Sequence, residues 1–530
     1  MKRTVSIFLA ALMLFSLSAR TAFAAGTGDV DGNGRITSAD ARLALRISAL
    51  LEQPDEETAL RADVDRSGRV SASDARIILR VAAKLQATPE DDAVAPADTG
   101  ETVTLPPGLL QRAASLDSYY ASGDRGLLTP FRDNGLGKAR MCEILLNKEE
   151  TSDAADRTDK SNIFCSPLSK GTIDYVVGEQ TFEGKKMYVL SCGRKVYAKD
   201  ARLLPSGYIL PPNRLTAGET VYGENTTDFY LDTLWAVPAG ICVGPQEYHT
   251  GYMDRRFNVS SFTAAYFDVI FYNTPAFSGD FSLPRNDFIG SVAWIDNGNG
   301  SVALRFRLRR PGGFCGCCVD LTDDGRFCIS VKNVTVRQRT VVIDAGHGGK
   351  DTGAPGFSAA VPEAAINLAI ASQTARELRS RGIRVITVRT TDEAHSREER
   401  TLFSRYFKPD AYVSVHNDYI DDPSITGTHA FYYYPWSMPL ADSIHRHMVA
   451  AYREKIYAPG TNAYAHADRG VHFYPFHVTR VEECPAVLVE CGYVSNAAEY
   501  GVLCAPANQK ILAAAIADGI VGYLDSLDGM

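Results

Sequence analysis

The last third of the chain alternates short apolar runs with longer stretches in which apolar residues recur every three or four positions. The runs are rich in β-branched residues and predict buried parallel strands, whereas the longer stretches predict amphipathic helices. Strands are predicted at residues 340–343, 383–388, 411–415, 428–434 and 486–489, and helices after Glu363, after Ser396, at 438–455 and within 508–524. This alternation predicts an α/β domain with a mostly parallel sheet flanked by helices. Ser396 and Glu399 have the spacing of a capping box, which marks a helix start.

Three of these apolar runs are followed by a residue that can bind a metal or carry a proton. His347 follows the run at 340–345, His416 follows 411–415, and Glu490 follows 486–489. The carboxyl ends of parallel strands meet at one edge of a sheet, where open α/β folds place their active sites. The sequence therefore predicts that these three side chains meet there, as in a metal-dependent hydrolase.

The first 24 residues have the pattern of a secretory signal. Lys2 and Arg3 precede an apolar run at 5–17, and Ala22-Phe23-Ala24 offers a cleavage site before Ala25. A retained anchor helix is the alternative, but the run is shorter than the roughly 20 residues that span a bilayer. The chain is therefore expected to be exported, with no integral membrane segment left after the signal is removed.

A twelve-residue loop occurs twice near the N-terminus, and its second copy begins 34 residues after the first. Oxygen side chains stand at loop positions one, three, five and twelve, which is the ligand set that Ca²⁺ requires. The predicted calcium ligands are Asp29, Asp31, Asn33 and Asp40 in the first loop and Asp63, Asp65, Ser67 and Asp74 in the second. Nothing in the repeat could act as a nucleophile or acid, so the two calcium ions are expected to be structural.

Each loop continues into a predicted helix, at 41–51 and 75–85, with apolar spacing at Leu43, Ile47 and Leu50 in the first. No entering helix precedes the first loop, and both loops end in Asp where an EF-hand has Glu. In these features residues 26–87 resemble a type I dockerin, a small α module that docks exported enzymes onto cohesin domains of a scaffold protein. The resemblance implies a cohesin-binding face, and the alternative is plain helix capping. The face would comprise Ser38, Ala39, Ala72 and Ser73.

The middle of the chain is predicted to be a linker followed by mainly β structure. Residues 88–107 are rich in Pro, Ala, Thr and Asp, the composition of an extended linker. Residues 110–210 are expected to form a small β-rich, barrel-like region, in which residues 187–204 weakly resemble the small Src-homology-type barrels of bacterial wall enzymes. Residues 222–335 resemble the β-sandwich that often precedes a wall amidase. Wall binding and a simple spacer role remain equal alternatives for this region.

Residues 340–526 carry five short motifs: 342–349 (VIDAGHGG), Glu363 four residues before 367–369 (NLA), 414–416 (SVH), 469–471 (RGV) and 485–496 (PAVLVECGYVSN). In these motifs the region closely resembles the zinc-dependent N-acetylmuramoyl-L-alanine amidases. The resemblance implies that His347, Glu363 and His416 bind zinc, and a catalytic zinc site needs about three such ligands and an open position for water. Zinc lowers the pKa of that water to about 7.

By the same resemblance Glu490 takes the proton from the attacking water and passes it to the departing amine. The bond implied is the amide between the lactyl group of N-acetylmuramic acid and L-alanine of the stem peptide. Arg469 and Arg480 stand where the family contacts substrate, and Arg480 could bind its carboxylates. Asn417 and Asp418 depart from the usual Ala-Asn after the second histidine, which adds negative charge near the metal.

The net charge and the cysteines limit which ligands and which cysteine chemistry can be expected. Without Lys2, Arg3 and Arg20 the chain has 52 basic and 63 acidic residues, a net charge of −11, so nucleic acid is not an expected ligand. The eleven cysteines include 315–318 (CGCC), which lacks the spacing of a paired zinc knuckle. Buried thiols are the preferred interpretation, with one disulfide or a small metal site as the alternative. We expect a monomer.

The sequence as a whole predicts a secreted, cell-wall-associated, multidomain peptidoglycan hydrolase that is docked on a scaffold. A wall-binding protein without activity is the first alternative, although a binder would not need all of His347, Glu363, His416 and Glu490. A zinc peptidase on the same fold is the second, and the bond that is cut would separate them. Taken singly, each of these residues is as well explained by a packed histidine or a solvated glutamate.

Overall fold

The computed structural model divides the chain into two compact units, Met1–Leu109 and Leu110–Met530. It describes residues 29–48 (except 34 and 37), 54–62, 64, 70, 75, 78, 139–145, 163–165, 167–182, 184–206, 208, 210–244, 262–281, 283, 288–298, 300–334, 338–358, 360–474 and 476–528. The expected signal at 1–24 and the expected linker at 88–107 lie outside these ranges. No helix in these ranges has the length and apolarity needed to cross a bilayer.

The N-terminal unit contains α2 (Ser38–Ser48) and α3 (Glu56–Ala62). The sequence pattern did not predict α3, which ends just before the second loop. The buried face of α2 is also shifted from the expected one, since Ala41 and Ala44 join Ile47 in the core while Leu43 is only partly buried. Small alanines let the two halves of the unit pack closely, which the larger leucine would not allow.

A five-stranded antiparallel sheet opens the second unit, in the order β5-β4-β3-β1-β6. Its strands are β1 (Arg140–Ile144), β3 (Ile173–Phe182), β4 (Lys185–Leu190), β5 (Lys195–Tyr197) and β6 (Ala201–Leu203). Asp174 is buried, and it accepts hydrogen bonds from Ser191 Oγ, from Cys192 N at 3.0 Å and from Asn273 Nδ2 at 2.9 Å. Asn273 belongs to the next domain, so this buried carboxyl fixes the small sheet to its neighbour.

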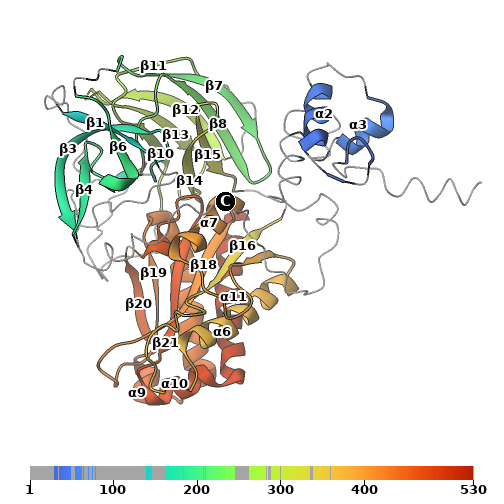
Figure 1. The fold of residues 1–530 in the computed structure, drawn as a ribbon. Coiled ribbons are helices and arrows are strands. Elements are labelled where there is room, and N and C mark those ends of the chain that lie inside the picture. The colour runs from blue at the N-terminus through green and yellow to red at the C-terminus, as the bar shows by residue number, and fades with distance from the viewer. Residues whose placement is uncertain are drawn as a thin grey trace, which may run out of the picture. The chain divides into compact units, whose positions relative to one another are not determined.

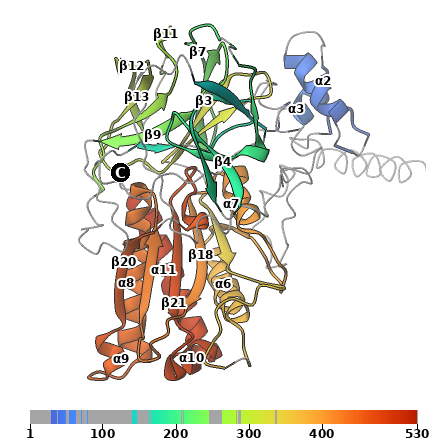
Figure 2. The ribbon, with the colours of Figure 1, turned by 60° about the vertical axis from the view of Figure 1, so that its left-hand side comes forward.

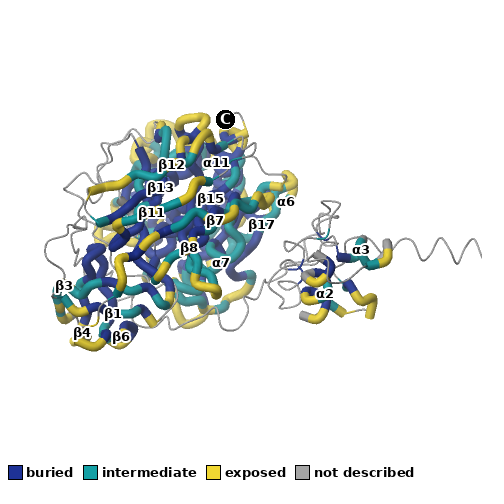
Figure 3. Tube along the Cα trace, turned by 90° about the horizontal axis from the view of Figure 1, so that it is seen from above, coloured by how far each residue is buried: buried dark blue, intermediate teal, exposed yellow. Residues whose placement is uncertain are grey.

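Two five-stranded sheets form a β-sandwich, in the orders β12-β13-β10-β9-β2 and β11-β7-β8-β15-β14. Buried positions predominate along β9, β10, β13 and β15, whereas β7, β11 and β12 are mostly half-buried or exposed (Figure 3). The core includes Phe229, Phe267 and Phe306, whose rings pack at centroid distances of 4.6 to 4.9 Å. The strands are β2 (Ile163–Cys165), β7 (Arg214–Tyr222), β8 (Thr226–Thr233), β9 (Ala239–Gly244), β10 (Tyr266–Phe271), β11 (Ala276–Ser278), β12 (Ile289–Asp296), β13 (Val302–Leu308), β14 (Cys317–Leu321) and β15 (Phe327–Lys332).

The sandwich starts earlier than the predicted residue 222. Strand β7 begins at Arg214, and β2, from the region assigned to the small barrel, pairs with β9. Sequence spacing could not show this exchange, because a short strand gives no sign of which sheet it joins. No disulfide joins two of the cysteines that the structure describes.

The C-terminal domain is built on a six-stranded sheet in the order β17-β16-β18-β21-β19-β20 (Figure 1). Strand β19 runs antiparallel to β21, and the other neighbouring strands are parallel. The antiparallel strand brings the start of β19 beside the end of β21. The strands are β16 (Thr340–Ala345), β17 (Arg384–Thr387), β18 (Ala411–Asp418), β19 (Thr428–Tyr432), β20 (Asp468–Phe473) and β21 (Ala486–Tyr493).

Helices α6 (Glu363–Ser380), α8 (Met438–Ala451) and α11 (Pro506–Asp528) pack together against this sheet (Figure 2). The predicted helix at 438–455 instead changes at Tyr452 into a π-helical turn, Tyr452–Ile456. Helix α7 (Arg397–Phe407) begins with the predicted capping box, which is confirmed, since Glu399 N donates to Ser396 Oγ and Ser396 N donates to Glu399 Oε2. Two short helices, α9 (Asn462–Ala465) and α10 (Ala497–Cys504), complete the domain.

The sandwich packs directly on the C-terminal domain, and one buried core continues through both. Lys332 Nζ of the sandwich lies 3.2 Å from Asp410 Oδ1, and Lys408 Nζ donates to Ser330 Oγ at 2.6 Å. Lys408 and Asp410 immediately precede β18, so the contact is made at the edge where the parallel strands begin. The strands end at the opposite edge, which carries the predicted site.

Candidate metal centre

His347 stands on a tight turn directly after β16. Its backbone φ is +60°, a left-handed conformation that side chains rarely adopt, so the surroundings must hold it. Two buried arginines do so: Arg389 donates to Ala345 O at 2.8 Å and Gly346 O at 2.9 Å, and Arg400 donates to His347 O at 2.7 Å. The turn that presents the first histidine is therefore fixed by charge-assisted hydrogen bonds.

Glu363 is the first residue of α6, and its carboxylate is held from several sides. Oε2 accepts from Ala354 N at 2.6 Å, while Oε1 accepts from Asn367 Nδ2 at 3.0 Å and from Asn417 N at 3.1 Å. The side chain of Asn417 in turn donates to Asn367 Oδ1 at 2.7 Å. These bonds orient the carboxylate before any metal arrives, which lowers the cost of binding one.

His416 lies near the end of β18, and its imidazole packs directly over Gly346. A Cβ at Gly346 would come within 2.2 Å of the His416 ring. Gly353 has the same role beside Glu363, where a Cβ would lie 2.4 Å from Oε2. Glycine is therefore required at both positions, because any larger residue would collide with a candidate ligand.

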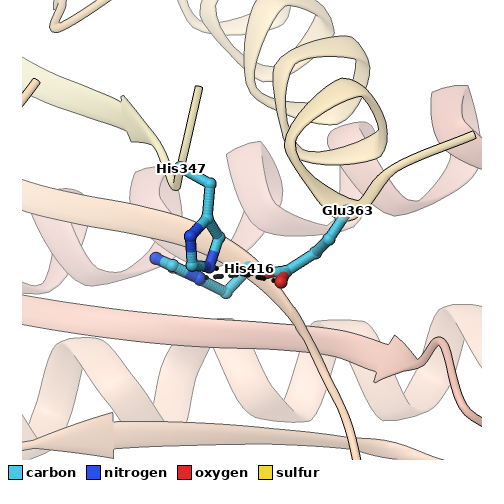
Figure 4. Close-up of side chains that lie close together, drawn as sticks. All are labelled: His347, Glu363 and His416. Carbon is cyan, nitrogen blue, oxygen red and sulfur yellow. Dashed lines mark hydrogen bonds and ion pairs between the residues drawn. The ribbon is translucent and has the colours of Figure 1, made fainter. Parts of the chain in front are cut away.

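The three predicted zinc residues converge (Figure 4). Their ligand atoms all lie within 4.8 Å of one another. His347 Nε2 lies 3.2 Å from Glu363 Oε2, and His416 Nδ1 lies 3.2 Å from Glu363 Oε1. Although burial opposes it, contact with the two imidazoles holds the pKa of Glu363 well below its usual value. The carboxylate is thus ready to bind a cation.

These donors fit a divalent metal of the zinc type. Two imidazole nitrogens and one carboxylate form a three-ligand set that leaves a further position for water. His347 Nδ1, on the far side of the ring from Glu363, lies 2.8 Å from Asp351 Oδ2. A carboxylate behind a histidine is the usual support of a metal ligand, because it fixes the ring and its tautomer. The sequence analysis missed Asp351 in this role.

Glu490 lies next to His416 on the neighbouring strand, as the register of β18 and β21 shows. The side chain is buried, and Oε2 has no hydrogen-bond partner among the described residues. Burial, and then the charges of Asp418 and Glu363, raise the pKa of Glu490 well above its ordinary value. Such a carboxyl can hold a proton near neutral pH.

A second pair beside Glu490 was not predicted. His429 is opposite Glu490 in the antiparallel register of β19 and β21, and its Nε2 lies 3.0 Å from Asp418 Oδ2. Burial lowers the pKa of His429, although Asp418 opposes the shift. No sequence signal marks the pair, because only the reversed direction of β19 brings His429 to this edge.

The two predicted substrate arginines lie in different surroundings. Arg469 is in β20, and its Nε donates to Thr426 O beside the edge where the site lies. Arg480 is 7% exposed and packs against His477, which is also buried, away from the three metal residues. The nearby His472 is buried, and its Nε2 lies 2.7 Å from Arg469 O. Arg469 is therefore the better placed of the two.

In the N-terminal unit, the first loop brings Asp29, Asp31 and Asp40 together, with candidate ligand atoms within 4.8 Å. Asn33 joins them through a hydrogen bond from its backbone N to Asp29 Oδ1 at 3.0 Å. The second set, Asp63, Asp65, Ser67 and Asp74, lies outside the described residues.

Of the four expected cohesin contacts, Ala39 is exposed, whereas the side chain of Ser38 and all of Ala72 and Ser73 are outside the described part of the chain. The cohesin face thus rests on a single described side chain.

Comparison with known proteins assigns the family. Residues 341–521 match the model of the N-acetylmuramoyl-L-alanine amidase family. Over 223 residues the chain is 30% identical to the uncharacterized protein YqiI of Bacillus subtilis strain 168, covering 41% of this chain and 98% of that protein. The chain belongs to the N-acetylmuramoyl-L-alanine amidase family. Residues 27–80 match the dockerin type I domain. Both resemblances drawn from the motifs are thereby confirmed.

Other members of the amidase family are similar over the same region. The probable cell wall amidase LytH of Staphylococcus epidermidis ATCC 12228 is 29% identical over 201 residues, or 37% of this chain. The chain spans 62% of the length of that relative. The catalytic domain of CwlV, an N-acetylmuramoyl-L-alanine amidase from Bacillus (Paenibacillus) polymyxa var. colistinus, is 34% identical. That match covers 36% of this chain and 99% of the solved catalytic-domain chain, with a TM-score of 0.33.

Proposed function

We propose that this member of the amidase family hydrolyses the amide between N-acetylmuramic acid and L-alanine of the peptidoglycan stem peptide. The observation that carries the proposal is the convergence of His347, Glu363 and His416 beside Glu490 at one edge of the sheet. A chain that only bound the wall would not need a preorganised three-ligand set next to a buried carboxyl whose pKa is raised.

The three ligands would hold zinc. The chemistry that a bound zinc ion supplies is Lewis-acid activation of a water molecule and of the amide carbonyl. The lowered pKa of Glu363 keeps one ligand ionised, and the hydrogen bonds from Ala354 and Asn367 keep it oriented. The chain's own contribution is thus a rigid, charged cradle.

Glu490 is proposed to move the proton. As a base it takes the proton of the attacking water, and as an acid it gives the proton to the departing amine of L-alanine. Its burial keeps the proton from bulk water, and its raised pKa makes the carboxylate a stronger base for the first transfer. The products are a free stem peptide and a glycan strand that keeps its lactyl carboxylate.

The stem peptide is proposed to lie towards β20. It carries carboxylates, and Arg469 is a fixed cation near the edge of the sheet, since its Nε is held by Thr426 O. Arg480 stays a weaker candidate, because a side chain 7% exposed cannot reach a bound peptide without rearrangement.

The dockerin is proposed to attach the enzyme to a cohesin domain outside the cell. Calcium bound by Asp29, Asp31, Asn33 and Asp40 would order the first loop, and the second loop would bind a second ion in the same way. Export through the signal at 1–24 is part of this proposal, and a monomer acting at the cell wall is its simplest form.

The test is digestion of purified peptidoglycan by the protein and by Glu490→Ala, each with and without a zinc chelator, with the fragments read by mass spectrometry. Free peptides that begin at L-alanine are expected only from the unchanged protein without the chelator. Cuts within the stem peptide would indicate a peptidase instead, and binding without any release would indicate a wall-binding protein.

A further inference from the structure

Exposed large apolar side chains occur at few places in the described residues, and in the C-terminal domain they occur at only one. Phe357 is 63% exposed, Tyr419 is 41% exposed and Ile420 is 42% exposed. The other large apolar side chains that are exposed in the described chain lie between residues 145 and 277, in or beside the small sheet and the sandwich. Scattered exposed residues need no explanation, but a group of three beside a metal centre does.

The three residues come from two loops that meet. Phe357 N donates to Val494 O at 2.7 Å, and Ile420 N donates to Ser495 Oγ at 3.2 Å. The two loops are therefore bonded to consecutive residues, the first to Val494 and the second to Ser495. We call the group of Phe357, Tyr419 and Ile420 the apolar platform.

The platform is continuous with the metal centre. Its first loop runs between His347 and Glu363, and its second loop begins at Tyr419, three residues after His416. Ala354, three residues before Phe357, donates its backbone N–H to Glu363 Oε2 at 2.6 Å. A molecule whose reacting bond lies at the metal can therefore extend onto this surface.

The first loop is held in a fixed shape. Tyr500 OH accepts from Val361 N at 2.9 Å and lies 3.0 Å from Ser358 O. A loop anchored on both sides of Phe357 presents the ring without needing to order it on binding, which preserves affinity. Covering an exposed apolar ring with a partner is favourable, because it removes apolar surface from water.

The charges near the apolar platform indicate which part of the substrate it binds. Asp421 and Asp422, both exposed, directly follow Ile420, so an anionic stem peptide would be repelled from the platform. Sugar rings carry no charge there, and their faces of C–H groups pack on aromatic rings. Arg469, which attracts carboxylates, lies in β20, and two strands separate it from β18.

We propose that the apolar platform binds the sugar rings of the glycan strand and so sets which way the substrate lies across the metal centre, with glycan on the β18 side and peptide on the β20 side. This inference rests on the proposed function, because it takes the substrate to be a glycan joined to a peptide.

Binding is measured first, on a Glu490→Gln background that removes turnover, with peptide-free glycan strands and with free stem peptide as separate probes. Phe357→Ala should weaken glycan binding about tenfold and leave peptide binding unchanged, whereas Phe357→Trp should retain glycan binding. Leu234→Ala, which removes a 59% exposed side chain from the sandwich, is the matched control and should change neither.

Hydrolysis is measured second, on the otherwise unchanged protein. Phe357→Ala should raise KM for peptidoglycan about tenfold with kcat unchanged. Glycan binding that is absent from the parent or unaffected by Phe357→Ala, or a loss of peptide binding instead, would overturn the platform. Failure of the proposed function would show separately, as a parent protein that releases no peptide beginning at L-alanine.

Discussion

Asp351 Oδ2 lies 2.8 Å from His347 Nδ1, so the first candidate ligand is braced by a carboxylate only four residues further along the chain. The same histidine faces Glu363 with its other nitrogen, at 3.2 Å. His347 therefore lies between two carboxylates, and although burial lowers the pKa of the imidazole, these two groups raise it above its usual value. The inner carboxylate would bind metal, and the outer one orients the ring.

Replacing Asp351 by Asn should weaken zinc binding by about 10- to 100-fold, because loss of a supporting carboxylate lowers the basicity and the order of the ligand it holds. Competition titration with a zinc-sensitive dye would measure the dissociation constant. Asp421→Asn removes an exposed carboxylate from the same domain and should leave zinc affinity unchanged. Equal affinities for Asp351→Asn and the unchanged protein would show that the bond has no role in metal binding.

Replacing Gly346 by Ala should disrupt the metal centre, since the new Cβ would meet the His416 ring at 2.2 Å. We expect a loss of zinc binding and a decrease in the free energy of unfolding of about 1–3 kcal/mol. Gly501→Ala is the matched control, because nothing lies within 4 Å of its Cβ position in α10. It should be neutral or slightly stabilising. The measurements are zinc titration and urea unfolding, and a normal zinc affinity in Gly346→Ala would contradict the packing described above.

Replacing Glu490 by Gln should stabilise the metal-free protein near neutral pH. The folded-state pKa of Glu490 lies well above the unfolded value because of burial and of Asp418 and Glu363. The carboxyl is therefore unfavourable to folding above the unfolded pKa, and this penalty disappears as the pH falls below that value. Unfolding of metal-free Glu490→Gln and of the unchanged protein at pH 7 and pH 4 should show a difference only at pH 7. A variant that is less stable than the parent at pH 7 would refute this account of the site.

Replacing Asp410 by Ala should destabilise the second unit by about 3–5 kcal/mol, because it leaves Lys332 charged and buried without its partner. The Lys332 and Asp410 side chains are each 1% exposed, and Arg339 also contacts Asp410. Urea unfolding gives the free energy, and Asp421→Ala, at an exposed position, is the control. A decrease in the free energy of unfolding of less than about 1 kcal/mol would mean that water takes the place of Asp410 beside Lys332. The ion pair would then contribute no more than a pair at the surface.

The sequence allowed the metal residues to be predicted because each stands at a strand end or a helix start within a motif. His347 and His416 follow apolar runs, so the periodicity places these two near one edge, whereas Glu363 was assigned to the metal only through the family resemblance. Asp351 follows His347 by four residues, but an acidic residue in a glycine-rich turn has many other uses.

Other parts of the site depend on tertiary structure that the sequence does not display. Arg389 and Arg400 contact the turn at His347 from distant segments of the chain. From the sequence, an arginine such as Arg400 in a helix is usually expected to be solvated. His429 lies at the site only because β19 runs antiparallel to β21. The direction of a strand in a sheet is set by pairing with residues far away in the sequence, and the local pattern of apolar residues does not show that pairing.

The shared core between the sandwich and the amidase domain has a consequence for how such enzymes can be recombined. Phe314 of the sandwich packs edge-on against Trp436, with ring centroids 4.9 Å apart, and Cys317 N donates to Glu482 O across the same junction at 2.9 Å. A cut between residues 334 and 340 would expose both of these faces to water. Exchanging either domain of this chain by itself would therefore leave apolar surface of the other exposed to water.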